Sequence, residues 1–108
     1  MKTPGQMVEL RFAWRSLEGP RVVAHFQAVV EREDPVMRRV FCRLVALKGI
    51  QIPPGVKDPL LTPESLRALE KKRVKVPQEA LEGLILPLKR ETLTGSLWIP
   101  YFESSFND

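Results

Sequence analysis

Hydrophobic and polar residues alternate over three long stretches in the first half of the chain, at residues 8–15, 21–33 and 36–48. The even-numbered positions are mostly apolar, whereas the odd-numbered positions are mixed and, in the first two stretches, carry most of the charge. A repeat of two is typical of a β-strand with one buried face, because successive side chains point to opposite sides of a sheet. The pattern therefore predicts three antiparallel strands, joined by a turn at 16–20 and by a second turn at Asp34-Pro35.

Two tight hairpins would fix the register of these strands. The sequence numbers of two residues that face each other would then sum to about 36 across the first turn and to about 68 across the second. In this register Arg11, His25 and Arg43 form one row, and Gln27 lies opposite Phe41. The even-numbered face is the predicted core, and it comprises Leu10, Phe12, Trp14, Val22, Ala24, Phe26, Ala28, Val30, Val40, Cys42, Leu44 and Ala46.

The second half of the chain carries start and stop signals for one helix. A Pro- and Gly-rich connection at 49–61 precedes Thr62, a good N-cap, and Pro63 suits the first helical position. The helix is expected to end at the basic residues 71–73, because cations are favoured at a helix C-terminus. A further turn is expected at 76–82, where Gly83 would stop it.

Two short strand candidates follow, at 84–90 and 97–102, with a turn at 92–96 between them. Pro87 and Pro100 each remove one backbone donor, so these strands are expected at an edge of the sheet or at a bulge.

This order predicts a strand-rich α+β fold: a three-stranded antiparallel meander, one helix, and a short Pro-containing β-hairpin. The arrangement resembles the oligonucleotide/oligosaccharide-binding fold, a five-stranded, partly open barrel with a helix between its third and fourth strands. The length of 108 residues suits a single domain. Residues 1–6 and 103–108 are expected to be a flexible arm and a flexible tail.

The charge distribution separates the two halves of the chain. The net charge is +4, and residues 1–50 hold nine Lys or Arg against five Asp or Glu, whereas residues 51–108 hold eight of each. The whole excess of positive charge therefore lies in the strand-rich half, as in proteins that bind polyanions.

Cysteine usage and hydropathy restrict the class of protein. A lone Cys42 allows neither an intramolecular disulfide nor a cysteine-based metal site, which suggests a reducing cytoplasm. No membrane-spanning or signal-like apolar stretch is present, so no membrane partner is expected. A single Asn and ten Pro hint at a thermophilic source.

The odd-numbered strand face is the first candidate site. Arginines there can neutralise phosphates, and Phe41 can stack on an unpaired base, which is what binding of single-stranded nucleic acid without base specificity requires. The alternative is a solvated face on which the arginines pair with Glu9, Glu31 or Glu33, or a face covered by the helix. The candidate nucleic-acid-binding residues are Arg11, Arg15, His25, Gln27, Arg39, Phe41 and Arg43.

Aromatic residues near the C-terminus form the second candidate site. They would present an apolar surface to a protein partner or to a second copy of the chain, by strand addition at an edge. The candidate partner-binding residues are Trp98, Tyr101, Phe102 and Phe106.

Catalysis finds little support in the sequence. His25 is the sole histidine and Cys42 falls on the apolar face, so no nucleophile and base pair is apparent. We expect a non-enzymatic binding module with no metal or cofactor: either a nucleic-acid-binding protein or an interaction or assembly subunit.

Overall fold

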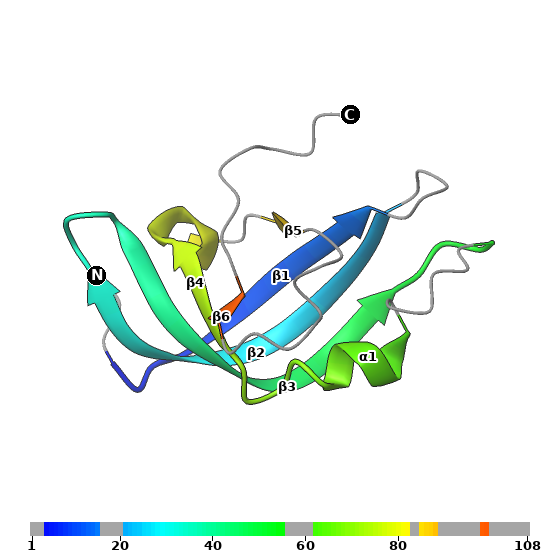
Figure 1. The fold of residues 1–108 in the computed structure, drawn as a ribbon, viewed down its shortest axis with the longest axis horizontal. Coiled ribbons are helices and arrows are strands. Elements are labelled where there is room, and N and C mark those ends of the chain that lie inside the picture. Colours follow the sequence, from blue (N-terminus) through cyan, green and yellow to red (C-terminus); the bar gives the residue numbers. More distant parts are fainter. Residues whose placement is uncertain (1–3, 16–20, 56–61, 83–84, 89–97, 100–108) are drawn as a thin grey trace.

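One curled sheet contains all the strands in the described part of the chain. The computed structural model describes residues 4–15, 21–55, 62–82, 85–88 and 98–99. Within these residues six strands follow the order β5-β1-β2-β3-β4-β6, and the sheet bends into a half-barrel (Figure 1). The predicted strand-rich α+β class and the partly open, OB-like barrel are therefore confirmed.

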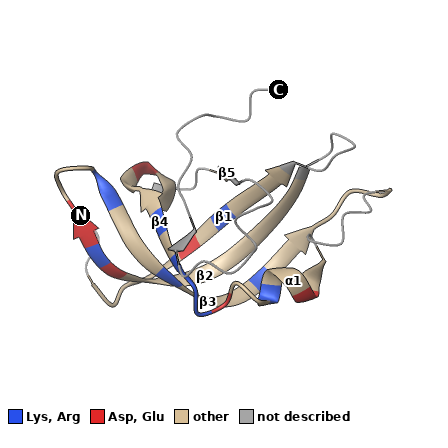
Figure 2. Cartoon of the chain, in the orientation of Figure 1, with Lys and Arg blue, Asp and Glu red and all other residues tan. Residues whose placement is uncertain are grey.

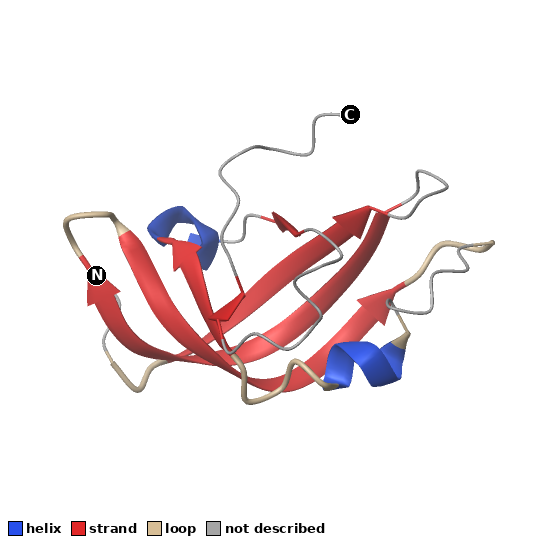
Figure 3. Cartoon of the chain, in the orientation of Figure 1, coloured by secondary structure: helices blue, strands red, loops and turns tan. Residues whose placement is uncertain are grey.

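The sheet is formed by three long strands and three short ones, accompanied by two short helices (Figure 3). The strands are β1 (Met7–Arg15), β2 (Arg21–Asp34), β3 (Arg39–Gln51), β4 (Arg73–Pro77), β5 (Ile85–Leu88) and β6 (Trp98–Ile99). The helices are α1 (Pro63–Arg67) and the 3₁₀ helix η2 (Gln78–Glu82).

The first hairpin has the register that the alternation predicts. Leu10 pairs with Phe26 and Arg11 with His25, with no irregularity between β1 and β2. The pairing continues beyond the start of β1, because Val30 bonds through its backbone to both Gly5 and Gln6. The predicted turn at 16–20 lies outside the described residues.

The predicted register of the second hairpin is wrong. Val29 lies opposite Arg43 rather than Arg39, and His25 lies opposite Gly49 rather than Arg43. Part of the shift arises at the turn, which occupies residues 35–38 and so begins at Pro35 instead of ending there. Arg38 closes this turn with a φ of +55°, a left-handed conformation that is uncommon outside glycine.

Three β-bulges modify this shift along the strands: the bulge at Glu31 lowers the sum of paired residue numbers from 73 to 72, and those at Val45 and Lys48 raise it to 74. The ladder between β2 and β3 leaves Glu31, Val45 and Lys48 without a partner residue on the opposite strand. Each extra residue increases the local twist and bends the strand, which is consistent with the curl of the sheet. The bulge at Val45 also reverses the alternation: Ala46, predicted in the core, lies opposite Gln27, and Leu47 instead lies opposite Phe26.

The core is otherwise the predicted even-numbered face. Of the twelve predicted core residues, all except Ala46 are buried, and α1, β4, η2 and β5 add apolar side chains to the same cluster. The ring of Phe12 packs between those of Phe26 and Trp14, at centroid distances of 5.9 and 6.3 Å. The added residues are Leu66, Leu69, Val74, Val76, Ala80 and Leu86.

The helix begins as predicted but ends earlier. The Thr62 side chain accepts a hydrogen bond from the backbone N–H of Ser65, and α1 ends at Arg67. The chain then returns to the sheet through Lys72, whose carbonyl accepts a hydrogen bond from the Leu44 N–H, and it continues as β4. Of the basic residues expected at a helix end, Arg73 is instead the first residue of β4, and Lys71 and Lys72 precede it. The 3₁₀ helix η2 takes the place of the predicted extra turn.

The last two strands do not pair as the predicted hairpin. β5 runs parallel to β1, and β6 runs parallel to β4, so the two strands lie at opposite edges of the sheet. Pro87 in β5 thus lies in an edge strand, as expected for a residue that lacks a backbone donor, whereas Pro100 lies outside the described residues.

Burial of Cys42 generates a prediction about alkaline pH. Its thiol is fully buried, and burial, with a smaller contribution from the Glu31 charge, raises its pKa from 9.0 to about 12. Between these pH values the folded chain holds a proton that the unfolded chain has lost, so stability falls as pH rises, by at most about 1.4 kcal/mol per pH unit. The free energy of unfolding, measured by urea titration, should fall more steeply above pH 9 for the native chain than for Cys42→Ala. Parallel pH profiles would contradict this.

Candidate functional site

Cationic side chains from three strands converge around one aromatic residue on the outer face of the sheet, away from the core. Phe41 in β3 lies between Arg32 of β2 and Lys75 of β4. In the next row on the same face, Arg43 lies beside Arg73, and Arg39 lies on the other side of Phe41 along β3. We call these six residues the basic patch: Arg32, Arg39, Phe41, Arg43, Arg73 and Lys75.

The bulge at Glu31 creates this arrangement. Without it, Arg32 would continue the even-numbered series of β2 and face the core. The extra residue instead places Arg32 directly opposite Phe41, on the face that Phe41 shares with Arg43. The Arg32 guanidinium carbon lies 3.9 Å from the centre of the Phe41 ring, a close cation–π contact.

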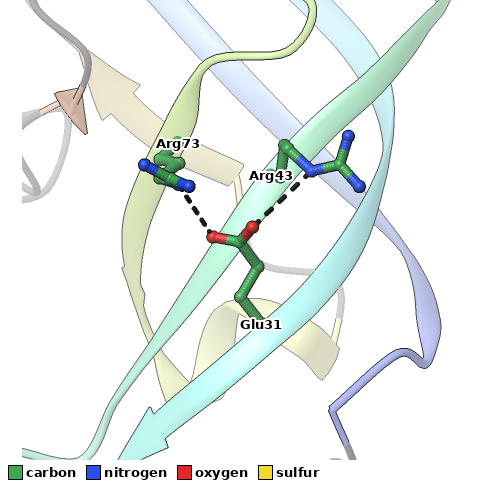
Figure 4. Close-up of polar contacts among 3 residues, drawn as sticks. All are labelled: Glu31, Arg43 and Arg73. Atoms are coloured by element: carbon green, nitrogen blue, oxygen red, sulfur yellow. Dashed lines mark hydrogen bonds and ion pairs between the residues drawn. The ribbon is translucent and has the colours of Figure 1, made fainter.

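Glu31 itself connects two arginines of the patch (Figure 4). The Arg73 Nε donates a hydrogen bond of 3.2 Å to one Glu31 oxygen, and the Arg43 Nε lies 3.6 Å from the other. The two arginine side chains remain nearly half exposed, at 49% and 46%. Glu31 therefore holds both guanidinium groups in place while leaving them accessible from solvent.

Positive charge exceeds negative charge on this surface. By register, Asp34 lies opposite Arg39, whereas Glu33 shares the face of the buried Val40. Among the described strand residues, the register thus places five cationic residues of the patch and two carboxylates, those of Glu31 and Asp34, in this part of the outer face. Figure 2 shows the blue Lys and Arg segments on β2, β3 and β4 in the part of the sheet nearest the β2–β3 turn.

The structure brings together three of the predicted nucleic-acid-binding residues and separates the others. Arg39, Phe41 and Arg43 belong to the basic patch, but the predicted row of Arg11, His25 and Arg43 does not form, because Gly49 occupies the position opposite His25. Arg43 lies opposite Val29, four residues farther along β2, which is about 13 Å at the usual rise of a strand. The side chain of Arg15 lies outside what the structure describes.

Gln27 lines a separate shallow hollow of about 220 Å³, shared with Met7, Val8, Glu9 and Lys48. Its charged members, Glu9 and Lys48, are both exposed and of opposite sign. The hollow therefore lacks the excess of cations that distinguishes the basic patch.

The predicted partner-binding residues are mostly outside the described ranges, since Tyr101, Phe102 and Phe106 all fall beyond residue 99. The backbone of Trp98 belongs to β6 and lies in register beside Arg73.

The candidate residues chosen from the sequence do not include three members of the patch: Arg32, Arg73 and Lys75. The run Arg73-Val74-Lys75-Val76 does alternate cationic and apolar residues, which is the strand signal that identified the first three strands. Its position after a helix start favoured a helix end instead. No comparable signal marks Arg32, because its face depends on a bulge.

The described residues do not suggest a different chemistry. They contain no group of three or more His, Cys, Asp or Glu residues placed to hold a metal ion. His25 is half-buried and lies opposite Arg11 across the strand pair, while Cys42 is in the core. Of the helices in the described part of the chain, none has the length and apolar character to cross a membrane.

No protein-family model, no curated protein and no solved structure matches the chain.

The ion pairs of Glu31 generate a prediction about stability. Because all three side chains are partly exposed, each pair should contribute no more than about 1 kcal/mol. We expect Glu31→Gln to lower the free energy of unfolding by up to about 2 kcal/mol at low salt, and by less in 1 M NaCl, where charges are screened. Urea unfolding at both salt concentrations measures this, with Glu9→Gln as a control on an exposed carboxylate. A loss above about 3 kcal/mol, or one unchanged by salt, would contradict the assignment of these pairs.

Proposed function

We propose that the chain is a small binding module that contacts single-stranded nucleic acid through the basic patch. The observation that carries the proposal is the position of the half-buried Phe41 among Arg32, Arg43 and Lys75 on the outer face of the sheet. Aromatic rings stack on unpaired bases of any sequence, and surrounding cations neutralise the phosphates that connect those bases. The combination suits binding with little base specificity.

The arginines provide the electrostatic part of this binding. Arg43 and Arg73 project from adjacent strands and are held by one carboxylate, so their guanidinium groups are partly ordered before a ligand arrives. A guanidinium presents donors that match the geometry of phosphate oxygens, and Glu31 occupies the Nε of each. The remaining N–H donors of Arg43 can bind a phosphodiester, and Glu31 keeps the two guanidinium groups close together.

Phe41 and Arg32 provide the stacking part. The Arg32 guanidinium carbon lies 3.9 Å from the centre of the Phe41 ring, and guanidinium planes also stack on nucleobases. A base can therefore add to the exposed side of the Arg32 plane, or displace Arg32 toward a phosphate and contact the Phe41 ring. In both cases the aromatic ring contributes binding energy without reading the sequence.

The proposal is tested by titrating a fluorescent single-stranded oligonucleotide at several salt concentrations. If each of the five cationic side chains neutralises one phosphate, log K should fall with log salt at a slope of about −3.5. Arg43→Ala should flatten that slope by about 0.7, to about −2.8. Arg67→Ala removes the same charge from exposed α1 and should leave the slope unchanged. Absence of binding at low salt, or equal effects of the two variants, would contradict the proposal.

Two substitutions at Phe41 distinguish the contribution of stacking to the binding affinity from the contribution of charge. Phe41→Leu keeps an apolar side chain but loses the ring, and we expect about tenfold weaker binding with an unchanged salt slope, since stacking contributes about 1–3 kcal/mol per base. Phe41→Tyr retains the ring and should bind like the native chain.

An interaction or assembly module is the second candidate. It is favoured by the position of β6, which contains Trp98 and forms the last strand at one edge of the sheet. An edge strand can accept a further strand from a partner. This alternative requires a salt-insensitive oligomer or complex that is lost on truncation after Leu97 and retained in Arg43→Ala.

A further inference from the structure

The turn between β2 and β3 presents exposed apolar side chains next to the basic patch. Val36 is 86% exposed and Met37 is 56% exposed, the two highest values among the large apolar residues of the described chain. Pro35 precedes them and is also exposed. The turn lies at the opposite end of the molecule from α1 (Figure 3). We call residues 35–37 the apolar tip.

Hydrogen bonds fix the turn that carries the tip at both of its ends. The Met37 N–H donates a hydrogen bond to the Asp34 carboxylate, at 3.3 Å, and the carbonyl of Arg38 accepts one of 3.0 Å from the Gln78 N–H of η2. Arg38 is held in the left-handed region, which is unfavourable for a residue with a Cβ. The exposed Val36 and Met37 therefore belong to a turn of defined shape.

Cations flank the tip on both strands. Arg32 lies on the β2 side, and Arg38 and Arg39 lie on the β3 side, against the carboxylate of Asp34, which is engaged with the turn. A ligand that fits this surface has an apolar, flat centre with negative charge on either side. The end of a nucleic-acid duplex has this form, because its terminal base pair is a flat apolar surface between two phosphate backbones. Minor-groove proteins insert apolar side chains such as Met and Pro between base steps, so these side chains make favourable contacts with the faces of base pairs.

We propose that the preferred ligand is a junction at which a duplex continues into a single strand. This rests on the proposed function: the single-stranded tail would follow the basic patch, while Val36 and Met37 pack on the last base pair of the duplex. Met37 and Phe41 are four residues apart, so the tip and the stacking ring are separated by at most about 13 Å. At about 3.4 Å per stacked nucleotide, a tail of about four nucleotides spans this distance.

The experiment compares fluorescent oligonucleotides by anisotropy at low salt: a single strand, a blunt duplex, and duplexes with tails of two and of six nucleotides. We expect the six-nucleotide tail to bind about tenfold more tightly than the single strand or the blunt duplex, and the two-nucleotide tail to lose most of this gain. The double variant Val36→Ser, Met37→Ser should abolish the preference and leave single-strand affinity and its salt slope within twofold of the native values. Ile52→Ser, an exposed apolar residue beyond the far end of β3, is the matched control.

Different failures have different meanings. Equal affinity for tailed and single-stranded probes, unaffected by the double variant, would overturn the junction proposal and leave the basic patch as a single-strand site. Loss of all oligonucleotide binding at low salt would overturn the proposed function itself. Binding to vesicles of phosphatidylglycerol that depends on Val36 and Met37, together with no preference for the tailed probe, would overturn the junction proposal in favour of a lipid surface.

Discussion

The fold depends on burying one apolar face of three long strands against a small amount of other structure. In β1 from Leu10, in β2 up to Val30 and in β3 from Val40 to Leu44, the even-numbered side chains form a continuous core. Among the described residues, α1 and the short strands contribute few residues to cover it. A flat sheet of this length would leave much of that face in water. The sheet is curled instead. The bulges at Glu31, Val45 and Lys48 are consistent with this shape, because each adds twist and lets the sheet curl around its own side chains.

The same irregularities determine which charges meet on the outer face. An unbroken β2–β3 ladder would keep Arg32 on the core side and away from Phe41. The extra residue at Glu31 instead brings Arg32 onto the ring, and Glu31 bonds to Arg43 and Arg73 from the neighbouring strands. The candidate site is thus a by-product of how the sheet curves. It is held by partly exposed ion pairs whose main effect is on geometry rather than on stability.

Sequence reasoning succeeded where a two-residue repeat and a buried face act together. The register of the first hairpin and the burial of eleven of the twelve proposed core residues follow from that repeat, because a slip by one residue would expose Phe12 and Phe26. It failed where a local irregularity decides the outcome. Arg38 closes the turn at a positive φ, but the turn contains no glycine or asparagine, the residues that usually indicate this conformation in a sequence. The bulged residues have ordinary strand-forming neighbours. The proposed row of Arg11, His25 and Arg43 was therefore wrong, although Arg39, Phe41 and Arg43 were chosen correctly as members of one face.

The central claim is that the bulged register gathers the binding groups around Phe41 and away from His25. It is tested most directly by mapping backbone amide chemical-shift changes in a ¹⁵N-labelled chain as a short single-stranded oligonucleotide is added at low salt. The account predicts that the largest changes fall on residues 31–43 and 73–75, in β2, β3 and β4. Changes centred on Arg11 and His25, or no changes at all, would contradict it.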